Sequence, residues 1–193
     1  CSNISGYADL LVRPKDSIES AIILKTCFYC QIPLTISAGK TNLTGSATPK
    51  GGLVLFTGLL TTPSIKLDLN NKEVTSPIGI PLEILRNKIL DLSKRSLYYP
   101  VDPTSRHDAL VGGTLSCNAS GFIPGEKGST RYWVQEIELL LPNGDFINAR
   151  KGQFISKKGY FTLTYEGNRI KFPVPTYKRP DIKSGRYFKA VWR

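Results

Sequence analysis

Residues 37–46, with the sequence SAGKTNLTGS, combine residue types that bind phosphate groups. Gly39-Lys40-Thr41 resembles at first sight the end of a nucleotide-triphosphate P-loop. A P-loop, however, needs a glycine five residues before its second glycine and a helix directly after the Lys-Thr pair. Leu34 occupies that first position, and three glycines and a proline follow Thr41 within a short distance, which disfavours a helix. The P-loop interpretation therefore fails.

The same segment still has the chemistry of an anion site. Gly39 and Gly45 let the backbone turn and approach a ligand closely, so consecutive N–H groups can converge on phosphate oxygens. Side chains add hydroxyl donors and one positive charge, from Thr41, Thr44, Ser46 and Lys40. Taken alone, the pattern is equally typical of a polar surface loop between two strands.

A second segment, residues 98–121, reads YYPVDPTSRHDALVGGTLSCNASG. Pro100 and Asp102-Pro103 predict a rigid loop and a helix start, and Gly112-Gly113 leaves the backbone open to close approach. Small residues continue to Gly121, as expected where a planar ligand lies against backbone. A Gly/Ser-rich surface loop is the alternative, and the length and apolar beginning of the segment argue against it.

The elements that position the first segment follow from apolar runs and turn residues. Residues 8–14 and 33–36 predict two buried strands, and 51–57 a third. Between the first two, a helix is expected to start at Asp16 or Ser17 and to stop before Pro33. Its apolar positions are read as Ile18, Ala21, Ile22 and Phe28. The result is a β-α-β unit that ends at residue 37.

Further along, alternating runs around Asn70-Asn71 predict a hairpin over 64–80, and Pro81 opens a helix over 81–94. The apolar stripe of this helix is Leu82, Leu85, Ile89 and Leu92. Another hairpin is expected over 133–150, turning at Asn143-Gly144, and 159–172 gives a weaker hairpin signal. We therefore expect an α+β chain with a small βαβ subdomain (1–57) and a larger subdomain (58–193) of mostly antiparallel sheet with flanking helices.

Composition narrows the function classes. The net charge is +11, from 26 Lys and Arg against 15 Asp and Glu, and basic residues are densest from Arg150 onward. No RNA-binding aromatic signature, zinc finger or helix-turn-helix accompanies the charge, so we expect no nucleic-acid partner. Peripheral membrane contact through the basic surface stays open. No apolar run approaches a membrane span, and a chain that begins with Cys1 and contains no Met is expected to be a fragment or processed piece.

The cysteines and sequons bear on the compartment. Cys27 and Cys30 have redox or half-zinc spacing, but the chain has one His and no second such pair, so we expect no metal and two buried small side chains. Asn3, Asn42 and Asn118 head glycosylation sequons, and two of these lie in the ligand segments. Secretion is discounted on that ground, and a reducing, cytoplasmic location is expected.

Read in order, the chain resembles a known family. LVRPKD, IPLTISAGKTNLTGSATP, GGLVLF, YYPVDPTSRHDALVGGTLSCNASG and GSTRYWVQEIELLLPNGD are similar to the FAD-binding (PCMH-type) domain of the vanillyl-alcohol oxidase / p-cresol methylhydroxylase superfamily. Within it they look like the branch of D-lactate and glycolate dehydrogenases, the FAD-linked oxidases, which also includes alkylglycerone-phosphate synthase. The resemblance covers most of residues 8–145 and implies the PCMH-type fold over the whole of 1–193.

The resemblance implies that the loop after the second strand binds the FAD pyrophosphate, where the family has a pattern like RGGGTGLSGG. Here Ser37 stands in place of the arginine, and Ala38, Lys40, Asn42 and Ser46 stand in place of glycines. Covalent members carry a His in this loop and this chain has none, which implies non-covalent FAD. The implied contacts in this loop are Ser37, Ala38, Gly39, Lys40, Thr41, Asn42, Gly45 and Ser46.

The second motif is implied to lie against the flavin and the pyrophosphate, although Val101 interrupts the family's Pro-Asp-Pro pattern. Its implied contacts are Pro100, Asp102, Pro103, Thr104, Ser105, Gly112 and Gly113. Further residues implied to line the cofactor are Ser116, Asn118 and Ala119, then Gly128, Ser129 and Thr130 in a later loop, and more weakly Ile182.

By the same resemblance, the full protein moves a hydride from the α-carbon of a D-2-hydroxy acid to the flavin. A C-terminal cap domain that binds the small-molecule substrate and carries catalytic residues is absent from these 193 residues, so none is nominated here. His107 lies in the flavin segment, but a lone His is more often structural. The first alternative is a degenerate, non-catalytic flavin-fold module, which the missing loop glycines favour. A nucleic-acid-binding basic domain and a cell-wall sugar-nucleotide reductase are weaker alternatives.

Overall fold

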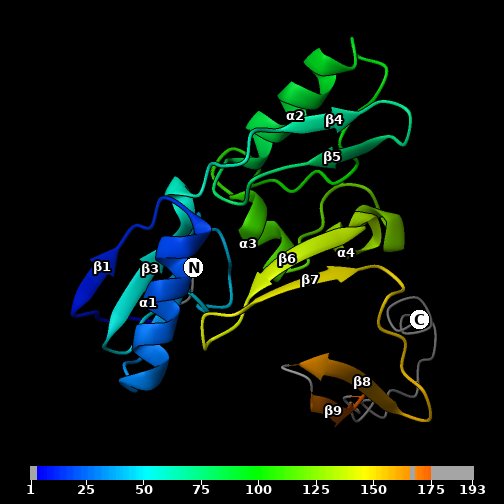
Figure 1. Ribbon diagram of the computed structural model, residues 1–193. Coiled ribbons are helices and arrows are strands. Elements are labelled where there is room, and N and C mark those ends of the chain that lie inside the picture. Colours follow the sequence, from blue (N-terminus) through cyan, green and yellow to red (C-terminus); the bar gives the residue numbers. More distant parts are fainter. Residues whose placement is uncertain (1–3, 166–167, 175–193) are drawn as a thin grey trace, which may run out of the picture. The chain divides into compact units, whose positions relative to one another are not determined.

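The computed structural model describes residues 4–165 and 168–174. The chain forms two compact units, one of residues 1–133 with 140–146 and one of residues 134–139 with 147–193. The first unit mixes helices with short strands, and short hairpins dominate the described part of the second (Figure 1). The mixture of helices and small sheets agrees with the predicted α+β class. The predicted subdomain boundary at residue 57 stays a prediction.

A three-stranded parallel sheet forms the N-terminal part of the first unit. Its strands are β1 (Leu10–Val12), β2 (Leu34–Ser37) and β3 (Leu53–Phe56), in the order β1-β3-β2. The central strand β3 is a continuous apolar run with Val54 and Leu55 buried, as is typical of a strand that pairs on both sides. The predicted β-α-β unit is confirmed, with the third strand inserted between the first two. The predicted burial of the first strand is wrong, because Leu10 and Leu11 are 57% and 58% exposed on a strand that pairs on one side only.

Helix α1 (Ser17–Tyr29) connects β1 to β2. The Asp16 side chain caps its first turn by accepting the Glu19 backbone N–H at 2.8 Å, and the Glu19 carboxylate accepts the Lys15 N–H, also at 2.8 Å. The helix ends where Cys30 caps it and Gln31 takes a left-handed φ of 53°. Both ends therefore lie where the sequence predicts them.

The predicted apolar face of α1 is wrong. Ile18, Ile22 and Phe28 are exposed, whereas Ser20 and Cys27 are the buried residues of the helix. The helix carries apolar residues around most of its circumference, so their positions do not indicate which side packs on the sheet. Both Cys27 and Cys30 were expected to be buried. Cys27 is buried, whereas Cys30, at the C-cap of the helix, is exposed.

The main core of the first unit lies between α2 (Leu82–Leu92), α3 (Val111–Ser116) and the hairpin of β4 (Lys66–Asp68) and β5 (Glu73–Thr75). Leu82, Leu85 and Ile89 are buried as predicted, together with Val111. The fourth residue of the predicted stripe, Leu92, is the last residue of α2 and is 42% exposed.

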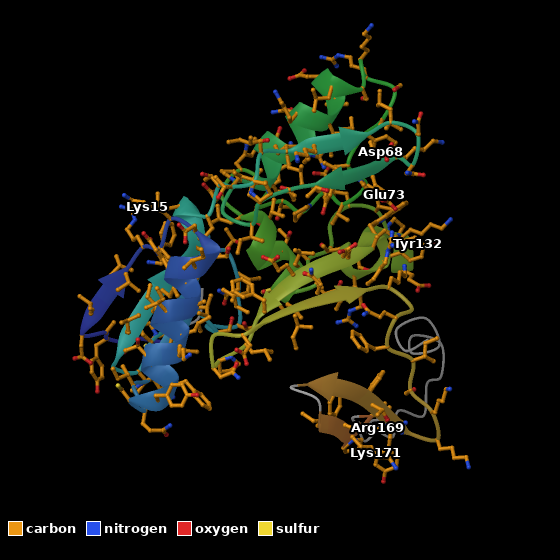
Figure 2. All side chains as sticks on the ribbon, in the orientation of Figure 1. Lys15, Asp68, Glu73, Tyr132, Arg169 and Lys171 are labelled. Carbon is orange, nitrogen blue, oxygen red and sulfur yellow. The ribbon has the colours of Figure 1, made fainter. Side chains whose placement is uncertain are left out.

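The β4–β5 hairpin turns where the sequence predicts it. The Asp68 carboxylate accepts the backbone N–H groups of Asn70 and Asn71 and the Asn71 amide, and these bonds lower the pKa of Asp68. Asp68 pairs with Glu73 across the hairpin, and Figure 2 shows both side chains on these strands.

The remaining elements are short. The 3-10 helices η1 (Thr57–Leu59) and η2 (Glu126–Gly128) and helix α4 (Thr130–Trp133) belong to the first unit. Strands β6 (Glu136–Leu140) and β7 (Phe146–Arg150) form the predicted hairpin around Asn143-Gly144. Among the described residues the later strands occur as separate two-stranded ribbons.

The last ribbon joins β8 (Tyr160–Tyr165) to β9 (Asn168–Pro173), in agreement with the weaker hairpin signal. Phe161 lies opposite Phe172, with ring centroids 6.2 Å apart. Lys171 extends its ammonium group over the Tyr160 ring at 4.2 Å, and Figure 2 shows Arg169 and Lys171 on β9. This ribbon lies beyond the segments that carry the predicted site.

Candidate functional site

The first predicted segment leaves the sheet at the end of β2. Ser37 is the last residue of that strand and is 1% exposed. Its carbonyl oxygen accepts the Thr57 hydroxyl at 3.3 Å, but its own hydroxyl has no hydrogen-bond partner. A buried hydroxyl without a partner is uncommon and is expected where a ligand or water completes the bonding.

The two predicted segments lie against each other at Gly39. A Cβ atom on Gly39 would lie 2.0 Å from the Asp108 carbonyl oxygen and 3.1 Å from the Ala109 Cα. Only glycine permits this approach, because real Cβ atoms do not come within 3.0 Å of such atoms. A Cβ on Gly113 would lie 3.2 Å from the Ala38 Cβ, so α3 also borders the loop. Segments about 70 residues apart in sequence therefore form one continuous surface.

The backbone of the loop has the conformation of an anion-binding nest. Lys40 has a φ of 56° and Gly45 a φ of 73°, both left-handed. Within the described residues, the backbone N–H groups of Gly39, Lys40 and Thr41 donate no hydrogen bond. Consecutive unpaired N–H groups around a left-handed residue are the arrangement that binds phosphate oxygens.

The loop's departures from glycine differ in their consequences. Of the four positions where the resembling family has glycine, only Lys40 is left-handed; Ala38, Asn42 and Ser46 do not take a positive φ. The last three substitutions therefore cost no backbone strain of this kind. Lys40 keeps the left-handed turn at a cost in conformational free energy, and it brings an ammonium group to the loop.

Asn42 holds the far side of the loop together. Its Oδ1 accepts the Ser46 backbone N–H at 3.2 Å and the Thr44 hydroxyl at 3.3 Å. The Thr44 hydroxyl, expected as a phosphate donor, is thus used inside the loop, as is the Ser46 backbone N–H. An open hollow of about 430 Å³ remains, lined by Lys40, Thr41, Asn42, Leu43, Gly45, Ala47 and Thr48.

The Asp-Pro loop, residues 100–109, is anchored in the core. Val101, the residue that interrupts the family pattern, is fully buried, and Pro103 is buried beside it. The Asp102 carboxylate contacts Arg106 at 2.9 Å and Arg86 at 3.3 Å. On its backbone side, a Cβ on Gly121 would lie 1.8 Å from the Asp102 carbonyl oxygen. The Asp102 side chain is therefore committed to contacts within the protein.

The connection between α3 and α4, residues 116–130, is held by hydrogen bonds between its own residues and to the start of α4. Asn118, with a left-handed φ of 46°, accepts the Arg131 backbone N–H on its Oδ1 at 2.8 Å. The Ala119 carbonyl accepts both the N–H and the hydroxyl of Thr130, at 3.0 and 2.8 Å. The Ser129 hydroxyl donates to the Glu126 carbonyl at 2.8 Å. These side chains hold the α3–α4 connection in place, and Ile182 lies outside the described residues.

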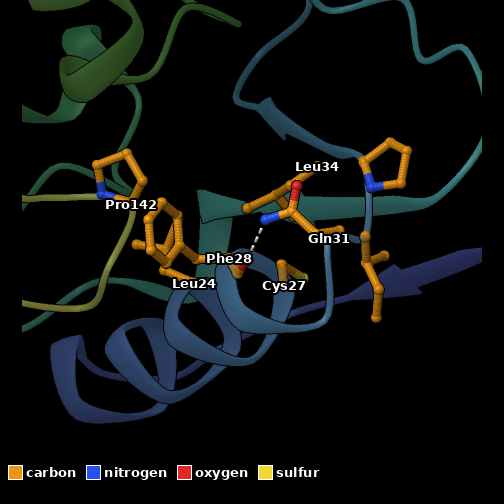
Figure 3. Close-up of a pocket in the computed structure, with 8 residues that line it drawn as sticks. Leu24, Cys27, Phe28, Gln31, Leu34 and Pro142 are labelled. Carbon is orange, nitrogen blue, oxygen red and sulfur yellow. Dashed lines mark hydrogen bonds between the residues drawn. The ribbon is translucent and has the colours of Figure 1, made fainter.

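A hollow of about 400 Å³ lies elsewhere, between the end of α1 and the start of β2 (Figure 3). It is lined by Leu24, Cys27, Phe28, Gln31, Ile32, Pro33, Leu34 and Pro142. Its walls carry no charged side chain, and the Gln31 amide donates to the Phe28 carbonyl at 2.8 Å. Burial, and secondarily the neighbouring Cys30 thiol, raise the pKa of Cys27. A raised pKa makes the Cys27 thiol less reactive than a free one.

No group of three or more His, Cys, Asp or Glu side chains that could hold a metal occurs in the described part of the chain. No helix within these residues is long and apolar enough to span a membrane. His107 is exposed in the turn before Asp108. The groups at the site that can bind an anionic ligand are the unpaired backbone N–H groups of residues 39–41.

The sequence missed the groups that join the two segments. The Asp108 carbonyl and the Ala109 backbone make the contact with Gly39. Every residue type has these backbone atoms, so the sequence does not indicate which of them form a contact. The ion pairs of Glu83, Arg86 and Arg106 were missed too. Opposite charges three and four residues apart, at 83/86 and 102/106, were the signal available.

Comparisons with known proteins identify the family of this chain. The family described as "FAD binding domain" matches residues 8–150. D-lactate dehydrogenase of Anaerostipes hadrus is 31% identical over 157 residues, which are 80% of this chain and 32% of that protein. Glycolate oxidase subunit GlcD of Bacillus subtilis (strain 168) is 31% identical over 140 residues, covering 72% of this chain and 29% of that protein.

A solved structure of alkyldihydroxyacetonephosphate synthase matches with a TM-score of 0.64 at 18% identity, covering 75% of this chain and 27% of that one. At this identity the likeness concerns the fold alone, and it confirms the PCMH-type FAD-binding fold. The chain spans about a third of the length of the curated relatives it matches.

The chain therefore belongs to the FAD binding domain family, and its cofactor is FAD. The residues present fit that cofactor. The unpaired N–H groups of residues 39–41, the partnerless Ser37 hydroxyl and the hollow beside Lys40 suit a pyrophosphate.

Proposed function

We propose that this chain is the FAD-binding part of a flavin-dependent oxidoreductase, and that the loop of residues 37–46 holds the FAD pyrophosphate without a covalent bond. The observation that carries the proposal is the approach of Gly39 to the Asp108 carbonyl, which joins the loop to the second motif. Residues 37–48 contain no His, Cys or Tyr, the side chains that attach flavins covalently.

The residues divide the work as follows. The N–H groups of Gly39, Lys40 and Thr41 bind and orient the pyrophosphate oxygens, and the Lys40 ammonium group offsets their charge. Asn42 keeps the loop in its bound shape beforehand, which lowers the entropic cost of binding. When bound, FAD supplies two-electron redox chemistry by accepting a hydride from a substrate carbon.

The substrate belongs to the full protein. We propose a D-2-hydroxy acid related to D-lactate or glycolate, on the support of the relatives' names and of about 30% identity. The relatives extend well beyond the matched part, and we propose that a further domain of the same protein supplies the substrate pocket and the catalytic side chains. We nominate no acid or base within the present residues.

Ligand competition tests the proposed pyrophosphate loop. The 193-residue chain is titrated with FAD, FMN and ADP, each followed by calorimetry or flavin fluorescence. If the loop binds a pyrophosphate, FAD should bind at least about tenfold more tightly than FMN, and ADP should compete with FAD. Equal affinity for FAD and FMN, with no competition by ADP, would refute the assignment. Release of intact FAD by acid precipitation checks that it is held non-covalently.

The substrate proposal has its own test. A longer protein that carries this chain is mixed anaerobically with D-lactate, glycolate or L-lactate, and the flavin absorbance is followed. Bleaching by D-lactate or glycolate but not by L-lactate supports the D-2-hydroxy acid. Bleaching by none of the three would overturn that substrate class and leave the FAD site unaffected.

The second candidate is a flavin-fold module that has lost its cofactor. The left-handed Lys40 favours it, since glycine is the residue that takes this conformation without strain. Failure of FAD to bind at any accessible concentration would support this candidate. We further propose a cytoplasmic location, supported by the free thiols of Cys27, Cys30 and Cys117. Peripheral membrane contact remains a proposal supported by the net charge alone.

A further inference from the structure

Four charged side chains meet where the Asp-Pro loop packs on α2. Glu83 and Arg86 come from the first turns of α2, and Asp102 and Arg106 come from the loop. Arg106 contacts Glu83 at 2.9 Å and Asp102 at 2.9 Å, while Arg86 contacts Asp102 at 3.3 Å and Glu83 at 3.6 Å. Each acid thus touches both bases, in a closed arrangement that we name the charge ring.

The charge ring is partly shielded from water. The side chains of its members are 23–31% exposed, and the contacting Glu83 Oε2 and Arg106 Nε atoms are buried. These two atoms meet as an ion pair without an aligned hydrogen bond. Partial burial and mutual contact make such a network stronger than an isolated surface pair.

Backbone hydrogen bonds fix the loop to the same end of α2. The Leu82 N–H donates to the Ala109 carbonyl at 2.9 Å, and the Glu83 N–H donates to the Arg106 carbonyl at 3.0 Å. Arg86 also donates to the Val101 carbonyl at 3.0 Å. The loop is therefore held at both of its ends, at 101–102 and at 106–109.

The opposite side of this loop contacts the pyrophosphate loop, since the Asp108 carbonyl packs on Gly39. A displacement of residues 101–109 would therefore displace the wall against which Gly39 and the unpaired N–H groups are set. Packed interfaces transmit such shifts because they have no free volume to absorb them.

We propose that the charge ring positions the Asp-Pro loop against the pyrophosphate loop and thereby sets the affinity for FAD. In this arrangement Asp102 is a positioning residue that acts through Arg86 and Arg106 and does not contact the cofactor. The inference rests on the proposed FAD site and assigns a different role to Asp102 than direct cofactor contact, which the motif resemblance implies.

A double-mutant cycle tests the inference on the 193-residue chain. Asp102→Asn and Arg106→Gln are each expected to weaken FAD binding about 5- to 30-fold. The FAD affinity of the double variant should lie within about twofold of that of the weaker-binding single variant, because both changes break the same network. Arg106→Lys, which keeps the charge, should recover part of the loss. Arg150→Gln is the matched control, since Arg150 forms an exposed pair with Glu136 at 3.9 Å and should leave the affinity unchanged.

Two results would overturn the inference. If the effects of Asp102→Asn and Arg106→Gln multiply, Asp102 acts on the cofactor independently of the ring. If neither variant weakens FAD binding while both remain folded by circular dichroism, the ring is a structural feature alone.

Hydrogen exchange gives a readout that does not need the cofactor. Asp102→Asn should raise amide exchange in peptides covering 101–113 and 37–46, and Arg150→Gln should not. Unchanged exchange in both peptides would overturn the inference even if wild-type chain failed to bind FAD. A wild-type chain that fails to bind FAD while these peptides loosen would instead contradict the proposed function and leave the positioning intact.

Discussion

Gly39→Ala probes the contact that joins the two halves of the site. The added Cβ would lie 2.0 Å from the Asp108 carbonyl oxygen, and since real Cβ atoms stay at least 3.0 Å away, the two loops must separate by about 1 Å. Gly39 does not have a positive φ, so the cost is steric and carries no backbone strain. Overpacking of this kind costs about 1–3 kcal/mol.

That free energy corresponds to a factor of about 5 to 150 in an equilibrium constant. Because the overlap separates the pyrophosphate loop from the Asp108 carbonyl, we expect Gly39→Ala to weaken FAD binding at least about tenfold. The assay is a fluorescence titration of the folded chain with FAD, checked by urea unfolding. The matched control is Gly152→Ala, at a left-handed glycine with open space around it, which should lose stability and keep its FAD affinity. A Gly39→Ala chain that is folded and binds FAD within twofold of wild type would show that the contact between Gly39 and Asp108 does not set the FAD affinity.

Three further predictions concern stability. Lys40→Gly removes the strain of a left-handed φ of 56° and should raise the free energy of unfolding, measured in urea, by about 0.5–1 kcal/mol. The control, Lys25→Gly in α1, should lower the free energy of unfolding by about 1 kcal/mol. Equal effects of the two changes would contradict the backbone strain at Lys40. Leu85→Ala removes a side chain that is 2% exposed and should cost about 2–5 kcal/mol, against less than about 1 kcal/mol for the 42% exposed Leu92→Ala; a reversal of that order would place the core elsewhere. Burial and the Cys30 thiol raise the pKa of Cys27, so its contribution to stability is full below its ordinary value of 9.0 and is lost as the pH rises through the folded-state pKa. Cys27→Ala should therefore reduce the loss of stability at alkaline pH, and Cys30 should alkylate before Cys27; a faster reaction at Cys27 would contradict its burial.

Elements with strong local signals could be predicted from the sequence. Asp16 before an apolar run, Pro81 before another, and the Asn70-Asn71 and Asn143-Gly144 turns all mark element ends where the structure has them. These signals act through a residue's own backbone and its near neighbours, so they survive whatever the rest of the chain does.

The buried face of α1 could not be predicted in this way. Ile18 and Ile22 look like core residues by spacing, yet Ser20 and Cys27 are the buried residues of the helix. A helix that is apolar on most sides leaves the choice of face to tertiary packing.

The candidate site, like the fold, could be predicted from the sequence only in part. Motif spacing located the loop of residues 37–46, and its hollow and unpaired N–H groups lie there. The role of Asp102 required the partners Arg86 and Arg106, which spacing alone does not assign. The necessity of Gly39 depends on the Asp108 carbonyl, about 70 residues away in sequence.

Equilibrium binding of FAD to the wild-type chain decides whether these residues form a flavin-binding domain. Purified chain, stripped of endogenous flavin, is titrated with FAD while absorbance and fluorescence are followed. We expect a yellow complex with one FAD per chain, an affinity that ADP reduces by competition, and full release of intact FAD by acid. A chain that is folded by circular dichroism, stays colourless and binds neither FAD nor ADP would contradict it.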